Sequence, residues 1–441
     1  MSKYDKFFKL ANEAGIQESE LYISENTALS FSLFHNEIVQ FSNNSSQYVL
    51  ARGIVNGRFG SASSDVWNNQ KCEYLVKEIK SNALVVENDD PAIIYAGSPQ
   101  YKKVSTYSKK LESIDTNKKI EICKELEKKI RSLDKRIIEV ESIGYSEIKE
   151  QVTIQNSKGL KLAQKSNYCV LYGSAVAKEG EQVKSDYSMY FDKSLDNLDL
   201  DKLAKEIVDK TVSQLGGEAC PTASYKTVLA PNVVASLLKA YLGNAAAENV
   251  QKKASLFIGK LDDKVASSKL TVSELPLTKS VFARSFDDEG VATSNKAIID
   301  KGILKTYIYT LSSAAKENRE STGNGYRRGA RASEDFAYLS VKKGNKTQEE
   351  LFEKVQNGVY ITSVQGLHAG LNQMSGNFSL QSTGFLIKDG KLDRGLDIIT
   401  LSGNLVDLFK SVELVGSDVK VFPSAVECPS LVIKSLKVSG K

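Results

Sequence analysis

Hydrophobic side chains follow a helical spacing in several long segments of the first half of the chain. The segments in which they recur every three or four residues are 4–14, 65–83, 117–133 and 198–215. Apolar and polar residues instead alternate over 29–34 and 148–155, which is typical of half-buried strands. Asn56-Gly57 indicates a hairpin turn, because both of its positions need positive φ. We therefore expect an α/β sandwich of antiparallel strands and long helices.

A boundary between two domains is predicted at a pair of glycines. Gly216-Gly217 ends the last helical segment of the first half, and short strands dominate after it. The expected domains are 1–216, an N-terminal α+β domain, and 217–441, a β-rich C-terminal domain. The fold class expected for the whole chain is α+β.

The second half is expected to form around one helix, predicted over 231–253. Pro231 stands in the first turn, where a helix accepts proline. The apolar residues that recur behind it are Val233, Val234, Leu237, Leu238, Tyr241, Leu242, Ala245 and Ala246. Hairpins with glycine turns are expected at 298–304 and 385–392. This half therefore predicts an antiparallel, barrel-like domain around a central helix.

Composition argues against several classes of protein. The 441 residues carry 59 basic and 54 acidic side chains, a net charge of +5 that is too small to indicate nucleic-acid binding. No apolar run approaches the ~20 residues that span a bilayer. Five scattered cysteines and the lack of a signal-peptide pattern predict a cytoplasmic protein. With only two histidines, His35 and His368, the chain is not expected to form a conventional zinc site alone.

The stretch 225–255 resembles the segment of the TldD/PmbA family that carries a His-Glu-x-x-x-His metallopeptidase motif. In that family two leucines precede the motif and a glycine precedes its second histidine. Here Lys239 stands at the first histidine position, Ala240 at the glutamate position and Asn244 at the second histidine position. A protonated lysine and a neutral amide are poor zinc ligands, and alanine cannot serve as a general base.

Other stretches carry the same resemblance, which is strongest after residue 226. The blocks that resemble the family are Asp-Asp-Glu-Gly at 287–290, Ser-Thr-Gly-Asn-Gly at 321–325, the loop over 366–379, and Thr-Leu-Ser-Gly-Asn at 400–404. With this degenerate motif, the resemblance implies the PmbA branch, also called TldE, whose members lack the metal motif. Catalytic members carry a further metal-binding cysteine near the C-terminus, but the pattern around Cys428 does not match, so that role is not carried over.

The resemblance implies a non-catalytic subunit of a heteromeric zinc metallopeptidase that degrades unfolded or extended peptides. Zinc is then expected in a TldD-like partner and no cofactor in this chain, which would bind peptide and stabilise the complex. A homodimer is expected when the chain is isolated. The alternative is a non-enzymatic homodimeric binding protein, in line with descriptions of the family as a modulator of DNA gyrase.

Candidate binding residues come from the two loops of this resemblance. Arg327 lies in a glycine-rich, basic loop over 321–332, whose N–H groups could hold an anion such as a peptide carboxylate; the alternative is a plain surface loop. His368, Asn372 and Ser375 lie in the loop over 366–379 and are candidates for contact with peptide or partner. For His368 the alternative is a structural, hydrogen-bonded histidine.

Two further patterns suggest chemistry but also have plainer interpretations. Three successive acids, Asp287 to Glu289, could hold a hard cation, although a solvated turn is the favoured interpretation. Ser313 and Lys316 fit the S-x-x-K pattern of penicillin-recognising enzymes, in which the lysine activates the serine. No Lys-Thr-Gly strand follows, so chance is the preferred explanation.

Overall fold

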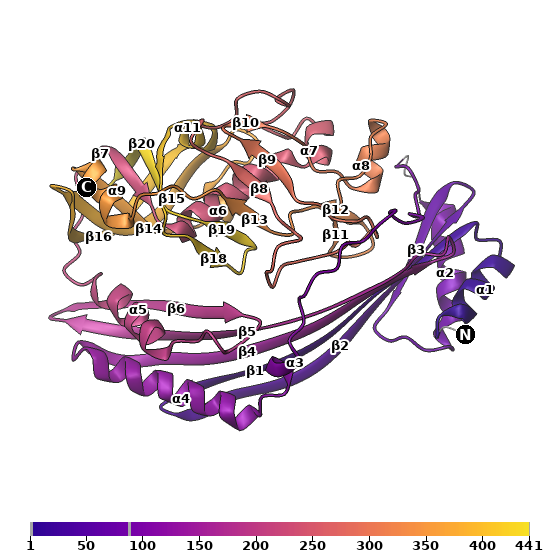
Figure 1. Ribbon diagram of the computed structural model, residues 1–441, viewed down its shortest axis with the longest axis horizontal. Coiled ribbons are helices and arrows are strands. Elements are labelled where there is room, and N and C mark those ends of the chain that lie inside the picture. The colour runs from indigo at the N-terminus through magenta and orange to yellow at the C-terminus, as the bar shows by residue number, and fades with distance from the viewer. Residues whose placement is uncertain (1–2, 87–89, 441) are drawn as a thin grey trace.

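The first half of the chain forms one long, curved antiparallel sheet (Figure 1). The structure is a computed structural model that describes residues 3–86 and 90–440. The sequence also predicts a polar, proline-containing connection over roughly 87–104, and its first three residues lie outside the described residues. The strands, in the order β3-β2-β1-β4-β5-β6, are β1 (Glu18–Phe34), β2 (Glu37–Val55), β3 (Arg58–Ser64), β4 (Ile137–Asn156), β5 (Lys161–Glu179) and β6 (Gln182–Asp192).

Two pairs of helices pack on the same face of this sheet, at its two ends. The helices are α1 (Asp5–Glu13) and α2 (Lys71–Val85) at one end, and α4 (Thr116–Leu133) and α5 (Leu200–Val212) at the other, with a short α3 (Lys109–Glu112) before α4. Leu21 of β1 packs under α1 and α2, and Phe31 under α4 and α5. Both positions are odd-numbered, and alternate residues of a strand share a face. The expected layers of helix on antiparallel sheet are confirmed.

Two local predictions in this half differ from the structure. The helix expected from residue 65 begins only at Lys71, because the side-chain oxygen of Asn68 accepts the N–H of Lys71 at 2.9 Å. The sequence also predicts a short strand at 21–23, and both this strand and the one expected over 29–34 are parts of the single 17-residue strand β1. The polar residues between them pair with β2 and β4 on both sides, so backbone pairing outweighs their weak strand propensity.

The second half contains a closed five-stranded barrel. Its strands, in the order β16-β15-β14-β7-β20, are β7 (Ala223–Leu229), β14 (Gly358–Gln365), β15 (Asn377–Lys388), β16 (Lys391–Asn404) and β20 (Leu431–Ser439). Pairing of β16 with β20 closes the ring, and β17 (Val412–Val415) adds to β20 outside it. Most pairs are antiparallel, but β7 and β14 run parallel. The expected barrel-like, largely antiparallel domain is confirmed.

A second sheet and several short helices complete this half. The sheet order is β10-β9-β8-β13-β19-β18, and its strands are β8 (Val272–Glu274), β9 (Lys296–Asp300), β10 (Ile303–Leu304), β13 (Leu339–Val341), β18 (Lys420–Phe422) and β19 (Val426–Cys428). The remaining elements are α6 (Pro231–Leu242), α7 (Ala247–Gln251), α8 (Leu311–Lys316), α9 (Gln348–Val355), α10 (Leu367–Gly370), α11 (Leu405–Lys410), β11 (Gly325–Arg327) and β12 (Ala332–Glu334). None of the described helices is both long and apolar enough to cross a membrane.

Helix α6 is the central helix of the second half (Figure 1). It contacts β14 of the barrel and β19 of the second sheet, and most of its side chains are buried. The continuous helix predicted over 231–253 is wrong after Leu242: a 3₁₀ turn, Gly243–Ala245, follows, and Ala246 is extended before α7. The Asn244 side chain bonds the carbonyl of Tyr241 at 3.0 Å, which favours this break over helix continuation.

An ion pair between the two halves predicts a specific acid sensitivity. Glu206 of α5 lies 2.8 Å from Nζ of Lys420 of β18 and 3.2 Å from Lys210. Burial alone would raise the pKa of Glu206, but the two ammonium groups outweigh burial and lower it to about 2. Because the folded pKa lies below its ordinary value of 4.5, this stabilisation is present above pH 4.5 and is lost as the pH falls toward 2.

We therefore expect Glu206→Gln to lower the free energy of unfolding by about 1 kcal/mol at pH 6 and by much less near pH 2. Denaturant titrations across that range measure the difference. The control is Asp209→Asn on the same helix, whose carboxylate pairs with Lys205 at the surface. An effect of Glu206→Gln that does not shrink with acid would contradict the assigned ion pair.

Candidate functional site

The positions that correspond to the metallopeptidase motif lie at the end of α6 and just beyond it. Lys239 is half-buried, and its Nζ donates to the carbonyl of Ser424 at 3.0 Å. Ala240 packs against the core of the second half. Asn244 is 6% exposed, and its Oδ1 accepts the N–H of Leu256 at 2.8 Å. Both polar side chains are therefore committed to backbone groups of their own chain.

This arrangement does not fit a zinc ion. The ammonium of Lys239 is a donor, Ala240 offers no base, and the amide of Asn244 already bonds backbone on both sides. Cys428 is buried beside the start of α6, where its Sγ donates to the carbonyl of Pro231 at 3.1 Å. Burial raises the pKa of this thiol, which disfavours the thiolate that a metal needs. In the part of the chain that the structure describes, no three His, Cys, Asp or Glu side chains gather into a group that could hold a metal.

The loop that contains α10 (Leu367–Gly370) brings His368, Asn372 and Ser375 to the surface beside the barrel. All three residues are exposed. Oδ1 of Asn372 accepts the N–H groups of Met374 and Ser375, both at 3.0 Å, so this oxygen holds the turn together. The loop therefore presents an imidazole, an amide nitrogen and a hydroxyl to whatever binds there.

Arg327 occupies a different environment from the one that a surface loop would give it. Its side chain is 1% exposed and lies between the two halves of the chain. Nε donates to the carbonyl of Asp288 at 3.0 Å, and Nη1 donates to the carbonyl of Ala330 at 2.8 Å. Nη2 lies 3.7 Å from Oε1 of Glu20, and the guanidinium lies 5.8 Å from the ring centre of Tyr22. Arg327 therefore fixes the interface between the halves, and a peptide could not reach it without separating them.

The three successive acids form a buried cluster, so the solvated turn favoured from the sequence is wrong. Asp287, Asp288 and Glu289 are 0%, 3% and 6% exposed. Oδ2 of Asp287 accepts the N–H of Gly325 at 2.8 Å, and Oδ1 of Asp288 pairs with Nη2 of Arg284 at 2.8 Å. Burial raises the pKa of both Asp287 and Glu289. The loop N–H groups expected to hold an external anion are thus used by carboxylates of this chain.

Close packing explains the glycine that follows Asn324 in the Ser-Thr-Gly-Asn-Gly block. A Cβ at Gly325 would lie 2.4 Å from Oε2 of Glu289, well inside contact distance. The same oxygen of Glu289 accepts the N–H of Leu311 at 2.7 Å and cannot easily move away. The block is therefore explained by the buried carboxylates, without a bound ligand.

A second buried polar network was missed by sequence reasoning. Glu274 of β8 is fully buried, and its Oε2 lies 2.7 Å from Nζ of Lys296. Nδ2 of Asn324 donates to both oxygens of Glu274 at 2.9 Å, and the N–H of Ala337 donates to Oε1 at 2.8 Å. Glu274 stands in a three-residue strand with no distinctive motif. The only sequence signal for this network is therefore Asn324, in the Ser-Thr-Gly-Asn-Gly block.

Ser313, which matches the S-x-x-K pattern together with Lys316, has a structural role. It is 4% exposed, and its Oγ accepts the N–H of Thr310 at 3.0 Å, while Oγ1 of Thr310 accepts the N–H of Ser313 at 3.1 Å. This reciprocal arrangement caps the N-terminus of α8. Lys316 pairs with Asp90. The hydroxyl is thus held in a cap, which does not support a serine nucleophile.

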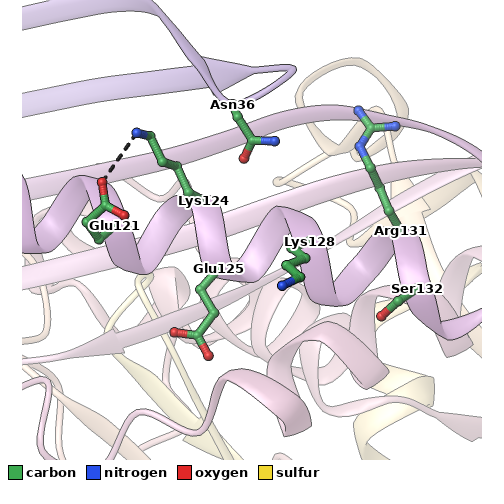
Figure 2. A pocket seen from close by; sticks show the side chains of 7 residues that line it. All are labelled: Asn36, Glu121, Lys124, Glu125, Lys128, Arg131 and Ser132. Carbon is green, nitrogen blue, oxygen red and sulfur yellow. Dashed lines mark hydrogen bonds and ion pairs between the residues drawn. The ribbon is translucent and has the colours of Figure 1, made fainter.

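A hollow of about 610 Å³ lies on α4 beside the hairpin between β1 and β2 (Figure 2). Its lining residues are Asn36, Glu121, Lys124, Glu125, Lys128, Arg131 and Ser132. Lys124 lies 3.3 Å from Glu121, and Arg131 is held by Glu127 at 2.9 Å and Glu139 at 2.6 Å. The cations are largely matched by acids of the same chain, as expected for a solvated helix face.

This chain is similar to known proteins over most of its length. The family model described as the PmbA/TldA metallopeptidase C-terminal domain matches residues 222–440, and the model of the central domain matches 109–215. A metalloprotease PmbA homologue from Buchnera aphidicola subsp. Acyrthosiphon pisum is 26% identical over 441 residues, covering 96% of this chain and 93% of the relative. The metalloprotease PmbA of Escherichia coli O157:H7 is 24% identical, covering 96% and 92%.

Solved structures share the whole architecture. A Thermotoga maritima protein described as a proposed modulator of a DNA gyrase superimposes with a TM-score of 0.91 at 29% identity, covering 99% of both chains. TldE from Thermococcus kodakarensis also gives a TM-score of 0.91, covering 100% of both chains, and at 22% identity shows a common fold. The α+β architecture found here is therefore the architecture of these proteins.

Proposed function

The chain belongs to the PmbA/TldD family of metallopeptidases, and on that premise we propose that it is a non-catalytic subunit of a heteromeric zinc peptidase. The proposal rests on one observation: the three residues at the motif positions offer neither zinc ligands nor a general base. Lys239 and Asn244 are bonded to backbone carbonyls and amides, and Ala240 has no functional group. Zinc, the general base and hydrolysis would then belong to a partner with an intact His-Glu-x-x-x-His motif.

In this proposal the chain binds unfolded or extended peptides in the cytoplasm and stabilises the complex. The exposed loop with His368, Asn372 and Ser375 supplies hydrogen-bonding groups for peptide backbone or for the partner. Strand addition is a suitable mode, because main-chain pairing does not read side chains. A non-enzymatic homodimer is the second candidate, favoured by the description of the Thermotoga relative as a proposed gyrase modulator.

The test measures zinc content and cleavage of an unfolded protein by this chain, by a motif-bearing relative from the same organism, and by their mixture. We expect no cleavage by this chain alone and chelator-sensitive cleavage by the mixture. Lys239→Ala is expected to leave the activity of the mixture within about twofold, because its ammonium only bonds the carbonyl of Ser424. Replacing a motif histidine of the relative should abolish cleavage.

Each other outcome selects a different conclusion. Stoichiometric zinc and cleavage by this chain alone would contradict the non-catalytic role. No complex on gel filtration and no cleavage in the mixture would favour the independent homodimeric binding protein. Cleavage by the relative alone at the rate of the mixture would remove any need for this chain in the reaction.

A further inference from the structure

Lys296, Asn324 and Glu274 form a closed triangle of contacts inside the second half of the chain. Glu274 of β8 and Lys296 of β9 lie opposite one another in the antiparallel pair, and Nζ of Lys296 lies 2.7 Å from Oε2 of Glu274. The same Nζ lies 3.0 Å from Oδ1 of Asn324, whose Nδ2 donates to both carboxylate oxygens at 2.9 Å. An amine, a carboxamide and a carboxylate are thus in mutual contact.

Water is largely excluded from these three groups. Glu274 and Asn324 are 0% exposed, and the side chain of Lys296 is 14% exposed. Burial removes the solvation that keeps an ammonium and a carboxylate charged, so the transfer of a proton from Lys296 to Glu274 costs less here than at the surface. That transfer frees the lone pair of the amine, which makes a lysine nucleophilic.

The carboxamide of Asn324 is oriented for attack by this amine. Its Oδ1 accepts the hydroxyl of Thr322 at 2.8 Å, and this donor can stabilise negative charge that develops on the oxygen. Because a C=O bond is about 1.2 Å long, Nζ of Lys296 lies within ~4.2 Å of Cγ of Asn324. A small rotation of the lysine side chain then gives the ~3–3.5 Å of a near-attack arrangement.

We propose that Lys296 and Asn324 react to form an isopeptide bond, with Glu274 as the acid–base catalyst. The Lys296 ammonium first passes a proton to the carboxylate of Glu274. Nζ then bonds to Cγ of Asn324, and the π electron pair of the C=O moves to Oδ1. Glu274 gives its proton to Nδ2 and accepts another from Nζ. The pair on Oδ1 re-forms the C=O bond as the Cγ–Nδ2 bond breaks. Ammonia leaves and takes the last proton from Glu274, which regenerates the carboxylate.

The bond joins β9 to the loop before β11, across 28 positions of the chain. A covalent link of this kind restricts the unfolded chain and thereby favours the folded state, as a disulfide does. Strand β11 begins at Gly325, directly after Asn324, so the link also anchors the segment that places Arg327 between the two halves. The inference does not depend on the proposed peptidase role.

The test is the intact mass of the purified full chain, measured by mass spectrometry under denaturing conditions. The wild-type chain is expected to be lighter than its sequence by the mass of one ammonia molecule. Tryptic digestion should then give a branched peptide that contains both Lys296 and Asn324. Glu274→Gln removes the carboxylate that accepts the proton, and Lys296→Met removes the nucleophile, so each variant should have the full mass of its sequence.

Lys296→Met also separates the proposed bond from a cyclic imide at Asn324-Gly325, which loses ammonia without needing a lysine. The control is Lys226→Met, at a surface lysine that pairs with Glu413 at 2.9 Å, and it should lose ammonia as the wild-type chain does. Thermal melting by circular dichroism establishes that each variant is folded. A wild-type chain of full mass, without the branched peptide, would overturn the inference. Loss of ammonia that persists in folded Lys296→Met or Glu274→Gln would overturn it equally.

Discussion

Arg327→Ala is expected to lower the free energy of unfolding by about 3–5 kcal/mol, the cost of removing one partner from a buried ionic network. The guanidinium is 1% exposed and donates to two carbonyls, and it lies 3.7 Å from Glu20 on the other half of the chain, whose carboxylate also pairs with Arg52. Burial and the neighbouring Arg52 lower the pKa of Arg327, and the carboxylates of Glu20, Glu289 and Asp288 act in the opposite direction. Urea denaturation of the purified chain measures the loss.

Arg328→Ala is the matched control. The side chain of Arg328 is 85% exposed and reaches only Asp335, at 3.4 Å. Its removal should change stability by less than about 0.5 kcal/mol. Similar small effects for both arginines would mean that Arg327 is not buried between the halves, and would return it to the set of surface candidates for peptide binding.

Glu274→Ala is also expected to lower the free energy of unfolding by about 3–5 kcal/mol. The buried network that it removes lies within the second half of the chain. The substitution leaves the ammonium of Lys296, the amide of Asn324 and the N–H of Ala337 without their shared acceptor in a buried position. Glu274→Gln keeps the shape and one acceptor oxygen, so its cost should fall between those of wild type and alanine. Denaturant unfolding followed by circular dichroism measures both variants.

The control for this prediction is a surface ion pair with a similar separation. Lys226 and Glu413 lie 2.9 Å apart, and each side chain is about one third exposed. Glu413→Ala should therefore cost no more than about 1 kcal/mol. Equal costs for Glu274→Ala and Glu413→Ala would show that burial does not strengthen the Glu274 network.

The helices of the first half could be predicted because their apolar positions repeat without interruption. The predicted segments 4–14, 117–133 and 198–215 lie within three residues of α1, α4 and α5 at each end. The hairpin turns at Asn56-Gly57 and Asp389-Gly390 were also predictable, since the structure places all four residues at positive φ. Local chemistry determines these features, so a local pattern is enough to find them.

The candidate site was only partly predictable, because much of it depends on what covers each residue. The loss of ligands at Lys239 and Asn244 can be seen in the sequence, whereas their backbone contacts cannot. A run of three acids is normally solvated, whereas here Asp287 to Glu289 are buried among segments distant in the sequence, such as 325–327 and Leu311. The periodicity of a sequence predicts which face of a strand is apolar. It does not predict that a polar segment will be covered by residues distant in the sequence.

Closure of the barrel has a consequence for the order in which the protein can fold during synthesis. Strand β7 pairs with β20, which is made roughly 200 residues later. At 5–20 residues per second, β7 and the apolar helix α6 wait roughly 10–40 s for that partner. The first sheet has all its strands by Asp192 and its covering helices by Val212, before β7 is made. The ribosome therefore carries a chain whose first half can already be folded while α6 is still uncovered, and this interval is when the protein is most open to aggregation and to chaperones.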